Sequence, residues 1–205
     1  MAHIAIIGAT GRAGSQLQEE ALRRGHRVTA IARLASSKLA GRTGVTPVDL
    51  DVLDAAALAA AVKGHDAVFS AAHFATVPPA AVIGPVKQAG VPRLLVVGGA
   101  GSLLVPGGVK VIDTPDFPEA YKAEASAGGQ FLDALRAEPS LNWTFLSPSA
   151  EFVEGERTGQ FRLGQDDLLV SAAGRSWITF ADFAIALLDE FEQPKHARER
   201  FTVGY

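Results

Sequence analysis

A short apolar run that leads directly into three evenly spaced glycines constrains the fold of this chain more than any other feature. The run is Ile4–Ile7, and Gly8, Gly11 and Gly14 follow it. A helix-compatible segment, Ser15–Arg24, comes next. This order predicts a strand, a tight turn and a helix whose free N–H groups face the turn. Such groups, together with the helix dipole, bind a pyrophosphate.

Each glycine of the turn has its own predicted role. Gly8 permits the turn, Gly11 lets the backbone approach the phosphates, and Gly14 allows the helix to lie close to the strand. The predicted dinucleotide contacts from this turn are Gly8, Thr10, Gly11, Arg12, Ala13 and Gly14. A glycine-rich turn without a ligand is the alternative, because turns use glycine for many reasons. The strand before the motif and the helix after it favour the dinucleotide interpretation.

Apolar segments alternate with helix-compatible segments along the chain. The expected strands are Ile4–Ile7, Arg27–Ala32, Thr46–Asp49, Ala67–Ala71, Arg93–Val97, Trp143–Leu146 and Arg200–Val203. The expected helices are Ser15–Arg24, Asp54–Val62, Pro79–Ala89, Glu124–Arg136 and Phe180–Phe191. Runs such as Leu94–Val97 are apolar throughout, as strands buried on both faces are. We therefore predict an α/β fold, a doubly wound parallel sheet of the Rossmann type, in a single domain over residues 1–205.

Two segments interrupt the strict alternation of strands and helices. Residues 103–118 follow the fifth strand, and residues 148–177 follow the sixth. The second segment contains two strand-like pieces, Gln160–Leu163 and Leu168–Ser171. Both segments leave the carboxyl ends of strands, where open α/β sheets bind their ligands. We expect them to be small insertions that form the walls of a substrate pocket.

The composition excludes several classes of function. The net charge is −3 without a basic block, so nucleic-acid binding through phosphate neutralisation has no support. The chain has no Cys, and its five His are scattered without a ligand-like pair, so we expect no metal site. Glycines and prolines break its longest uncharged run, so we expect no membrane segment. With no expected signal peptide, we predict a cytoplasmic monomer or homodimer that acts on a small molecule.

The residue after the second strand bears on the choice of nucleotide. In sites that bind NAD, a carboxylate at the end of this strand takes the ribose hydroxyls. Here Ala32 holds that place and Arg33 follows it. A guanidinium binds a 2′-phosphate in bidentate fashion, whereas a carboxylate would repel it. We therefore expect NADP(H) in preference to NAD(H), with Arg12 close enough to assist. The alternative is that Arg33 is an ordinary solvated loop residue.

The end of the third strand lies beside the adenine in a Rossmann sheet. Asp51 could accept a hydrogen bond from the adenine amino group, with Val52 against the ring. The alternative is that Asp51 or Asp54 only caps the next helix.

Small residues end the fourth strand. Ala71 and Ala72 would let the dinucleotide pass close to the backbone, and His73 follows them. His73 could reach the phosphates or the nicotinamide ribose, although a solvated loop residue is the alternative.

Six segments spread over nearly the whole chain carry the pattern of a known group of proteins. They are Ile6–Gly14, Leu94–Leu103, Asp113–Pro118, Leu141–Pro148, Gly155–Gly159 and Arg200–Tyr205. On these segments the chain resembles the atypical short-chain dehydrogenase/reductases. Within them it is similar to the NAD(P)H-binding group labelled as candidate NADH-flavin reductases, relatives of the biliverdin-IXβ/flavin reductases and the NmrA-like proteins.

The resemblance implies where the nicotinamide end of the cofactor lies. Gly98 and Gly99, at the end of the fifth strand, would run beside the nicotinamide. Ser147, Pro148 and Ala150, after the sixth strand, would close over it.

The chain departs from the standard members of this superfamily at the catalytic pair. Those enzymes use Tyr-x-x-x-Lys, in which Lys lowers the Tyr pKa for proton exchange with a carbonyl. Here Tyr121 is followed at once by Lys122, and position 125 is Ala125. Hydride transfer to a flavin or quinone needs little acid catalysis, so it suits such a site. Our remaining catalytic candidates are Lys122, which could also hold the nicotinamide ribose, and Ser102.

Two functions fit these residues. The first is an NADPH-dependent reductase that transfers hydride to a flavin or a similar flat acceptor. The second is a dinucleotide-binding redox sensor without turnover, as in the NmrA-like proteins.

Overall fold

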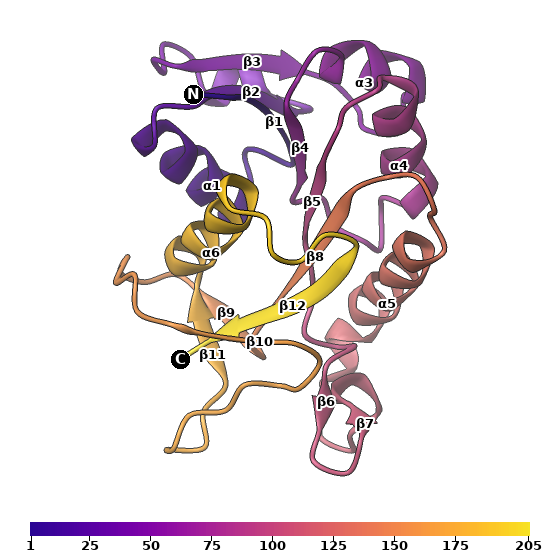
Figure 1. The fold of residues 1–205 in the computed structure, drawn as a ribbon, viewed down its shortest axis with the longest axis vertical. Coiled ribbons are helices and arrows are strands. Elements are labelled where there is room, and N and C mark those ends of the chain that lie inside the picture. The colour runs from indigo at the N-terminus through magenta and orange to yellow at the C-terminus, as the bar shows by residue number, and fades with distance from the viewer.

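A computed structural model describes residues 1–205 and shows an eight-stranded sheet with helices on both faces (Figure 1). The strand order is β10-β12-β8-β5-β4-β1-β2-β3, and only the β10–β12 pair is antiparallel. The strands are β1 His3–Ile7, β2 Arg27–Ala32, β3 Val45–Asp49, β4 Ala67–Ser70, β5 Leu94–Val97, β8 Trp143–Pro148, β10 Arg162–Gly164 and β12 Glu199–Gly204. The chain reverses its direction across the sheet between β1 and β4. In open α/β sheets, ligands bind at this reversal, beyond the carboxyl ends of the strands.

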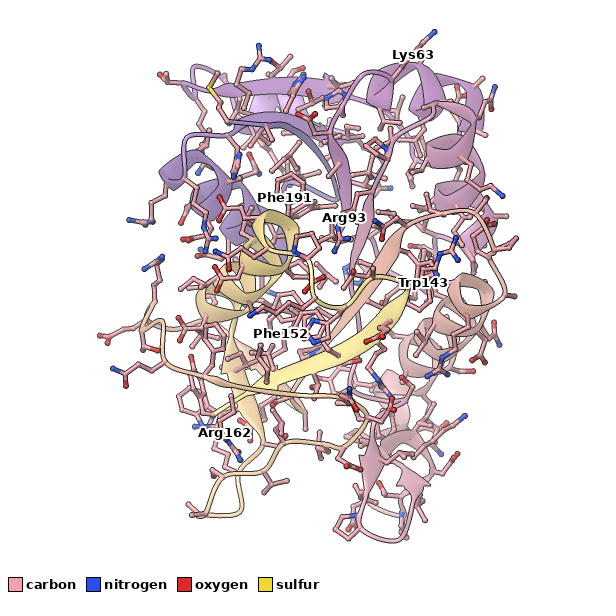
Figure 2. The ribbon with its side chains drawn as sticks, in the orientation of Figure 1. Lys63, Arg93, Trp143, Phe152, Arg162 and Phe191 are labelled. Atoms are coloured by element: carbon pink, nitrogen blue, oxygen red, sulfur yellow. The ribbon has the colours of Figure 1, made fainter.

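Two layers of helices bury the two faces of the sheet. Helices α1 (Arg12–Arg23) and α6 (Phe180–Glu192) pack together on one face. Helices α3 (Ala55–Val62), α4 (Pro79–Gln88) and α5 (Lys122–Arg136) cover the other. Among the residues labelled in Figure 2, Phe191 lies near the end of α6 and Trp143 lies on the side of the sheet that α5 covers.

The alternation along β1 shows why the sheet needs both layers. Ile4 and Ile6 belong to the core cluster under α1 and α6, whereas Ala5 and Ile7 belong to the cluster under α3, α4 and α5. All four side chains are buried, because a parallel strand in the middle of such a sheet has no solvated face. The predicted doubly wound parallel sheet is confirmed.

Short helices and strands lie at the carboxyl edge of the sheet. Helix α2 (Ala35–Lys38) follows β2, and β6 (Leu104–Val105) pairs with β7 (Val109–Lys110) as a hairpin. Two 3₁₀ turns, Val111–Asp113 and Glu119–Tyr121, lead from this hairpin into α5. A separate parallel pair joins β9 (Glu151–Val153) to β11 (Trp177–Thr179).

Most predicted elements agree with the structure to within one or two residues. The predicted N-cap of α3 is present, since the Asp54 carboxylate accepts a hydrogen bond from the Ala57 N–H at 3.0 Å. The prediction that Leu168–Ser171 is a strand is wrong. Only Asp167, just before it, forms an isolated bridge, and it does so with Leu104 of β6. Helix α1 also begins earlier than predicted, at Arg12, because the glycine turn feeds directly into it.

Candidate functional site

A cleft of about 570 Å³ opens at the carboxyl ends of β1, β2, β3 and β4. It therefore lies at the point where the strand order reverses. Its lining residues are Ile7, Gly8, Thr10, Gly11, Ile31, Ala32, Arg33, Leu34, Lys38, Leu50, Asp51, Val52, Leu53, Ala71, Ala72, His73, Thr76 and Val77. Nine of the predicted cofactor contacts are among them, namely Gly8, Thr10, Gly11, Arg33, Asp51, Val52, Ala71, Ala72 and His73.

Backbone contacts around the glycine turn explain two of its three glycines. Gly8 has a positive φ of 73°, and a Cβ there would lie 2.5 Å from the Ala71 carbonyl oxygen. A Cβ on Gly14 would lie 2.2 Å from the Gly8 carbonyl oxygen. Both contacts involve backbone, which cannot rotate away, so only glycine fits at these positions. The turn is thereby held tightly between β4 and α1.

The first turn of α1 is open for an anion. Gly11 is the N-cap of the helix, and it is exposed and has no side chain that could accept a hydrogen bond from the first-turn N–H groups. Such groups carry the positive end of the helix dipole and bind phosphate oxygens. Thr10 and Gly11 line the cleft, so this helix end borders it. A dinucleotide diphosphate fits the chemistry of this position.

The β2 end of the cleft is cationic. Arg33 and Lys38 line it, and Arg33 is exposed. The nearby Asp49 carboxylate accepts a hydrogen bond from the Ser36 N–H at 2.8 Å, which ties α2 to β3. No carboxylate stands in the place of Ala32. This end of the cleft therefore has the charge that a phosphate group requires.

The neighbouring β3 end offers an apolar surface with one carboxylate. Leu50 and Val52 line the cleft together with Ile31. The Asp51 carboxylate accepts a hydrogen bond from the Leu53 N–H at 3.0 Å and remains exposed at the cleft. A local turn therefore uses one oxygen of Asp51, and the predicted adenine contact remains a prediction.

Beyond β4, the wall of the cleft comes from residues 71–77. The Ala71 N–H donates to the Ile7 carbonyl at 2.9 Å, which joins this wall to the end of β1. The His73 side chain is 84% exposed, and its Nδ1 lies 3.6 Å from a carboxylate oxygen of Glu124 on α5. The structure thus brings His73 to the cleft, where its ring lies within ion-pair distance of Glu124.

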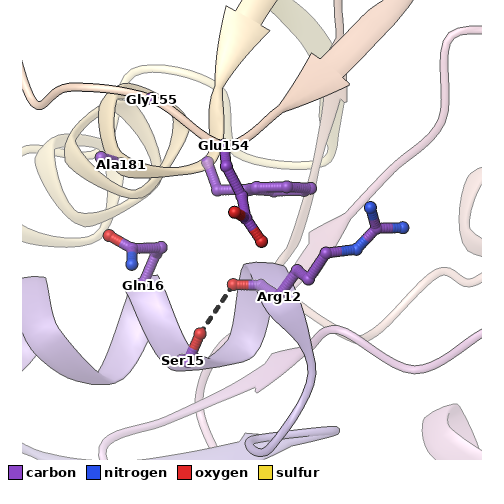
Figure 3. Close-up of a pocket in the computed structure, with 7 residues that line it drawn as sticks. Arg12, Ser15, Gln16, Glu154, Gly155 and Ala181 are labelled. Carbon is purple, nitrogen blue, oxygen red and sulfur yellow. Dashed lines mark hydrogen bonds between the residues drawn. The ribbon is translucent and has the colours of Figure 1, made fainter.

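A second, smaller cleft of about 220 Å³ lies on the other side of the α1 N-terminus (Figure 3). Arg12 lines this cleft with Glu154, and its guanidinium stands 5.4 Å from the centre of the Phe180 ring. The Ser15 hydroxyl donates to the Arg12 carbonyl at 2.8 Å. The structure therefore does not bring Arg12 into the cleft that Arg33 lines, and its assistance to Arg33 remains a prediction.

A segment after β9, which we call the strap (residues 154–160), borders this smaller cleft. Arg157 of the strap donates to both carboxylate oxygens of Glu20, at 2.8 and 2.9 Å, and these bonds lower the pKa of Glu20 below its ordinary value. The fully buried Asp182 carboxylate accepts from the backbone N–H groups of Thr158 and Gly159, at 2.8 and 2.9 Å. The strap is therefore fastened to both α1 and α6.

The residues predicted at the nicotinamide end lie apart from the main cleft. Gly98 is packed, since a Cβ there would lie 2.3 Å from the Phe145 ring, whereas Gly99 faces open space. Ser147 is fully buried at the end of β8, and its hydroxyl has no hydrogen-bond partner. Four other predicted contacts, Ala13, Gly14, Pro148 and Ala150, also lie outside the lining of the cleft.

Neither catalytic candidate lines the main cleft. The Lys122 ammonium pairs with the Glu119 carboxylate at 2.6 Å, and its side chain is about half exposed. The Ser102 hydroxyl lies 3.5 Å from the Arg200 guanidinium. Tyr121 is 65% exposed and has no hydrogen-bond partner through its hydroxyl. Their catalytic roles remain predictions.

The two segments predicted as pocket walls contact each other. The Leu104 N–H donates to the Asp166 carbonyl, and the Leu168 N–H donates to the Leu104 carbonyl, both at 2.8 Å. The Asp166 carboxylate also pairs with Arg200 of β12. Residues 103–118 and 148–177 are thus joined beside the end of the sheet.

Nine lining residues of the main cleft are not among the predicted cofactor contacts, namely Ile7, Ile31, Ala32, Leu34, Lys38, Leu50, Leu53, Thr76 and Val77. Leu34 and Leu53 are 60% and 55% exposed. A usable signal was their position, because each follows closely after a predicted strand that ends at the cleft.

Comparisons with known proteins agree with this geometry. A family model described as NAD(P)H-binding matches residues 8–191. The uncharacterized protein YwnB of Bacillus subtilis is 45% identical, over 98% of this chain and 97% of that protein. A crystal structure of a candidate epimerase from Bacteroides thetaiotaomicron is 40% identical, with a TM-score of 0.93 over 100% of this chain and 97% of that one.

A crystal structure of a candidate NADH-flavin reductase from Streptococcus pneumoniae is 36% identical, with a TM-score of 0.85 over 100% of this chain and 99% of that one. None of the helices in the present structure has the length and apolar character needed to cross a membrane. The matched residues include the glycine turn, every lining residue of the main cleft except Ile7, and all of the helices except the last residue of α6. The chain belongs to the NAD(P)H-binding family, among the atypical short-chain dehydrogenase/reductases.

Proposed function

We propose that the protein is an NADPH-dependent oxidoreductase that passes a hydride to a flavin or a similar flat acceptor. The observation that carries the choice of nucleotide is the exposed Arg33 on the cleft, next to Ala32 where NAD sites place a carboxylate. The glycine turn and the open first turn of α1 would hold the diphosphate. Arg33, with Lys38 beside it, would hold the 2′-phosphate.

The chain's own residues also bear on the reaction. Bound NADPH would supply the hydride. The chain offers no Tyr-x-x-x-Lys pair, since Ala125 stands where the lysine would be. An electron-poor ring needs orientation more than acid catalysis, so a flat acceptor suits this site. A relative from Streptococcus pneumoniae, described as a candidate NADH-flavin reductase, supports the same class of acceptor.

Calorimetric titration with NADPH and with NADH tests the nucleotide. Arg33→Ala should weaken NADPH binding about 10- to 100-fold, since a hydrogen bond to a charged group contributes about 1.5–3 kcal/mol. It should change NADH binding little. Arg27→Ala is the matched control, because Arg27 is also exposed but begins the same strand at its opposite end. An equal loss for both nucleotides would refute the assignment of Arg33 to the 2′-phosphate.

Oxidation of NADPH, followed by its absorbance with FMN, riboflavin or a quinone added, tests the reaction. Turnover with one of these acceptors supports the reductase. Tight NADPH binding without turnover on any of them would instead support the non-catalytic sensor. That second function is favoured by one observation, the absence of Lys122 and Ser102 from the lining of the cleft.

A further inference from the structure

One wall of the main cleft is held from outside the cleft. Its residues 73–77 leave the end of β4 and contribute three lining residues, His73, Thr76 and Val77. The N–H groups of Phe74 and Ala75 point away toward α5. Each donates to one carboxylate oxygen of Glu124, at 2.8 Å.

The position of Glu124 in its helix favours the ionised carboxylate that accepts these two hydrogen bonds. It lies in the first turn of α5, where the helix dipole stabilises a negative charge. Two hydrogen bonds to an ionised carboxylate are stronger than bonds between neutral groups. The structure offers the Phe74 and Ala75 N–H groups no other acceptor. The Thr76 and Val77 N–H groups close a local turn on the His73 carbonyl, at 3.3 and 3.0 Å, so Glu124 is what joins this turn to α5.

Packing of Phe74 against α5 and β8 completes the attachment of the wall. The Phe74 ring lies 5.2 Å from the Phe131 ring and 6.0 Å from the Phe145 ring, measured between centres. Gly128 makes room for it, because a Cβ there would lie 3.1 Å from the Phe74 ring. Phe74 thus fills an apolar site behind the wall, while the neighbouring His73 projects from its exposed face.

We propose that Glu124 is a positioning residue for dinucleotide binding. It fixes residues 73–77 from α5, and so the affinity of the cleft depends on a carboxylate that does not line it. The same helix begins at Lys122, which would lie at the nicotinamide end. One helix therefore connects the wall of the main cleft to the other end of the proposed site. This inference rests on the proposed binding of NAD(P)H.

The test compares Glu124→Gln with the full-length wild-type protein. Glutamine keeps the shape and one acceptor oxygen but loses the second acceptor and the charge. We expect faster hydrogen exchange at the amides of Phe74 and Ala75, and NADPH binding about tenfold weaker by calorimetry. Saturating NADPH should restore the slow exchange of these two amides. The melting temperature should stay within about 3 °C of wild type, because the bonds lie at a partly exposed loop.

Asp133→Asn is the matched control, because Asp133 is an exposed carboxylate of the same helix whose nearest partner is Arg136. It should change neither exchange nor affinity. Faster exchange in Glu124→Gln with unchanged NADPH affinity would show that the carboxylate is merely structural and would overturn the proposal. Unchanged exchange would overturn it as well. A wild-type protein that binds neither NADPH nor NADH would instead refute the proposed function, which distinguishes the two failures.

Discussion

Replacing Gly14 by alanine would place a methyl group where α1 meets the glycine turn. The new Cβ would lie 2.2 Å from the Gly8 carbonyl oxygen and 2.9 Å from the Ala9 Cα. Both neighbours are backbone atoms, so no side-chain rotation relieves the contact. An ordinary contact begins at 3.4 Å, which requires the start of α1 to move about 1.2 Å from the turn.

Overpacking of this kind lowers the free energy of unfolding by about 1–3 kcal/mol. In a protein of 150–250 residues, each kcal/mol lowers the melting temperature by about 2–4 °C. Gly14→Ala should therefore melt about 2–12 °C below wild type in a calorimetric scan. It should also bind NADPH more weakly, because the N–H groups of the first turn move with the helix.

Gly129→Ala provides the control for this substitution. Gly129 lies within α5, and a Cβ there meets nothing within 4 Å. Alanine in a helix interior is favoured over glycine by about 0.5–1 kcal/mol, so this variant should melt slightly above wild type. A Gly14→Ala protein that melts at or above the wild-type temperature would refute the steric reasoning.

Three further outcomes are expected. Asp182→Ala should lower the free energy of unfolding by at least about 1.5–3 kcal/mol, the value of one hydrogen bond to a charged group, as measured by chemical denaturation. It should also expose the strap to trypsin at Arg157, as measured by limited proteolysis. The bonds to Glu20 hold its folded pKa below its ordinary 4.5, so their stabilisation is present above pH 4.5 and is lost as the pH falls through the folded pKa. Glu20→Gln should therefore be less stable at pH 7 and should lose less stability than wild type between pH 5 and 3, in urea titrations at each pH; an equal acid loss would contradict this. Asp54→Ala should lower the free energy of unfolding by about 0.5–2 kcal/mol, because α3 loses its N-cap. An unchanged urea midpoint would contradict this prediction.

The central strands and helices were predictable because their signals are local. β5 and the Ile4–Ile7 part of β1 are continuous apolar runs, and such runs identify strands buried on both faces. Asp54 and the glycines around α1 mark helix ends through their own backbone chemistry. The strand–glycine–helix order at the start predicted the side of the sheet on which the cleft opens.

The predicted piece Gln160–Leu163 overlaps β10, but the short strands β9 and β11 could not be predicted, because their partners are distant in sequence. β9 pairs with β11, and Leu104 forms an isolated bridge with Asp167, across more than 20 residues in each case. The residue pattern of Leu168–Ser171 is typical of a strand, but no neighbouring strand pairs with this segment in the structure. A strand exists only where a neighbour accepts its hydrogen bonds.

The sequence by itself determined the dinucleotide turn, the doubly wound sheet and the cationic end of the cleft at Arg33. Spacing and residue type alone specify these features, since glycine geometry and charge act locally. Only the tertiary structure decided that Arg12 turns toward Phe180 and that Glu124 holds the wall at residues 73–77. Both are contacts between elements far apart in the chain, and the direction of a long side chain depends on what packs against it.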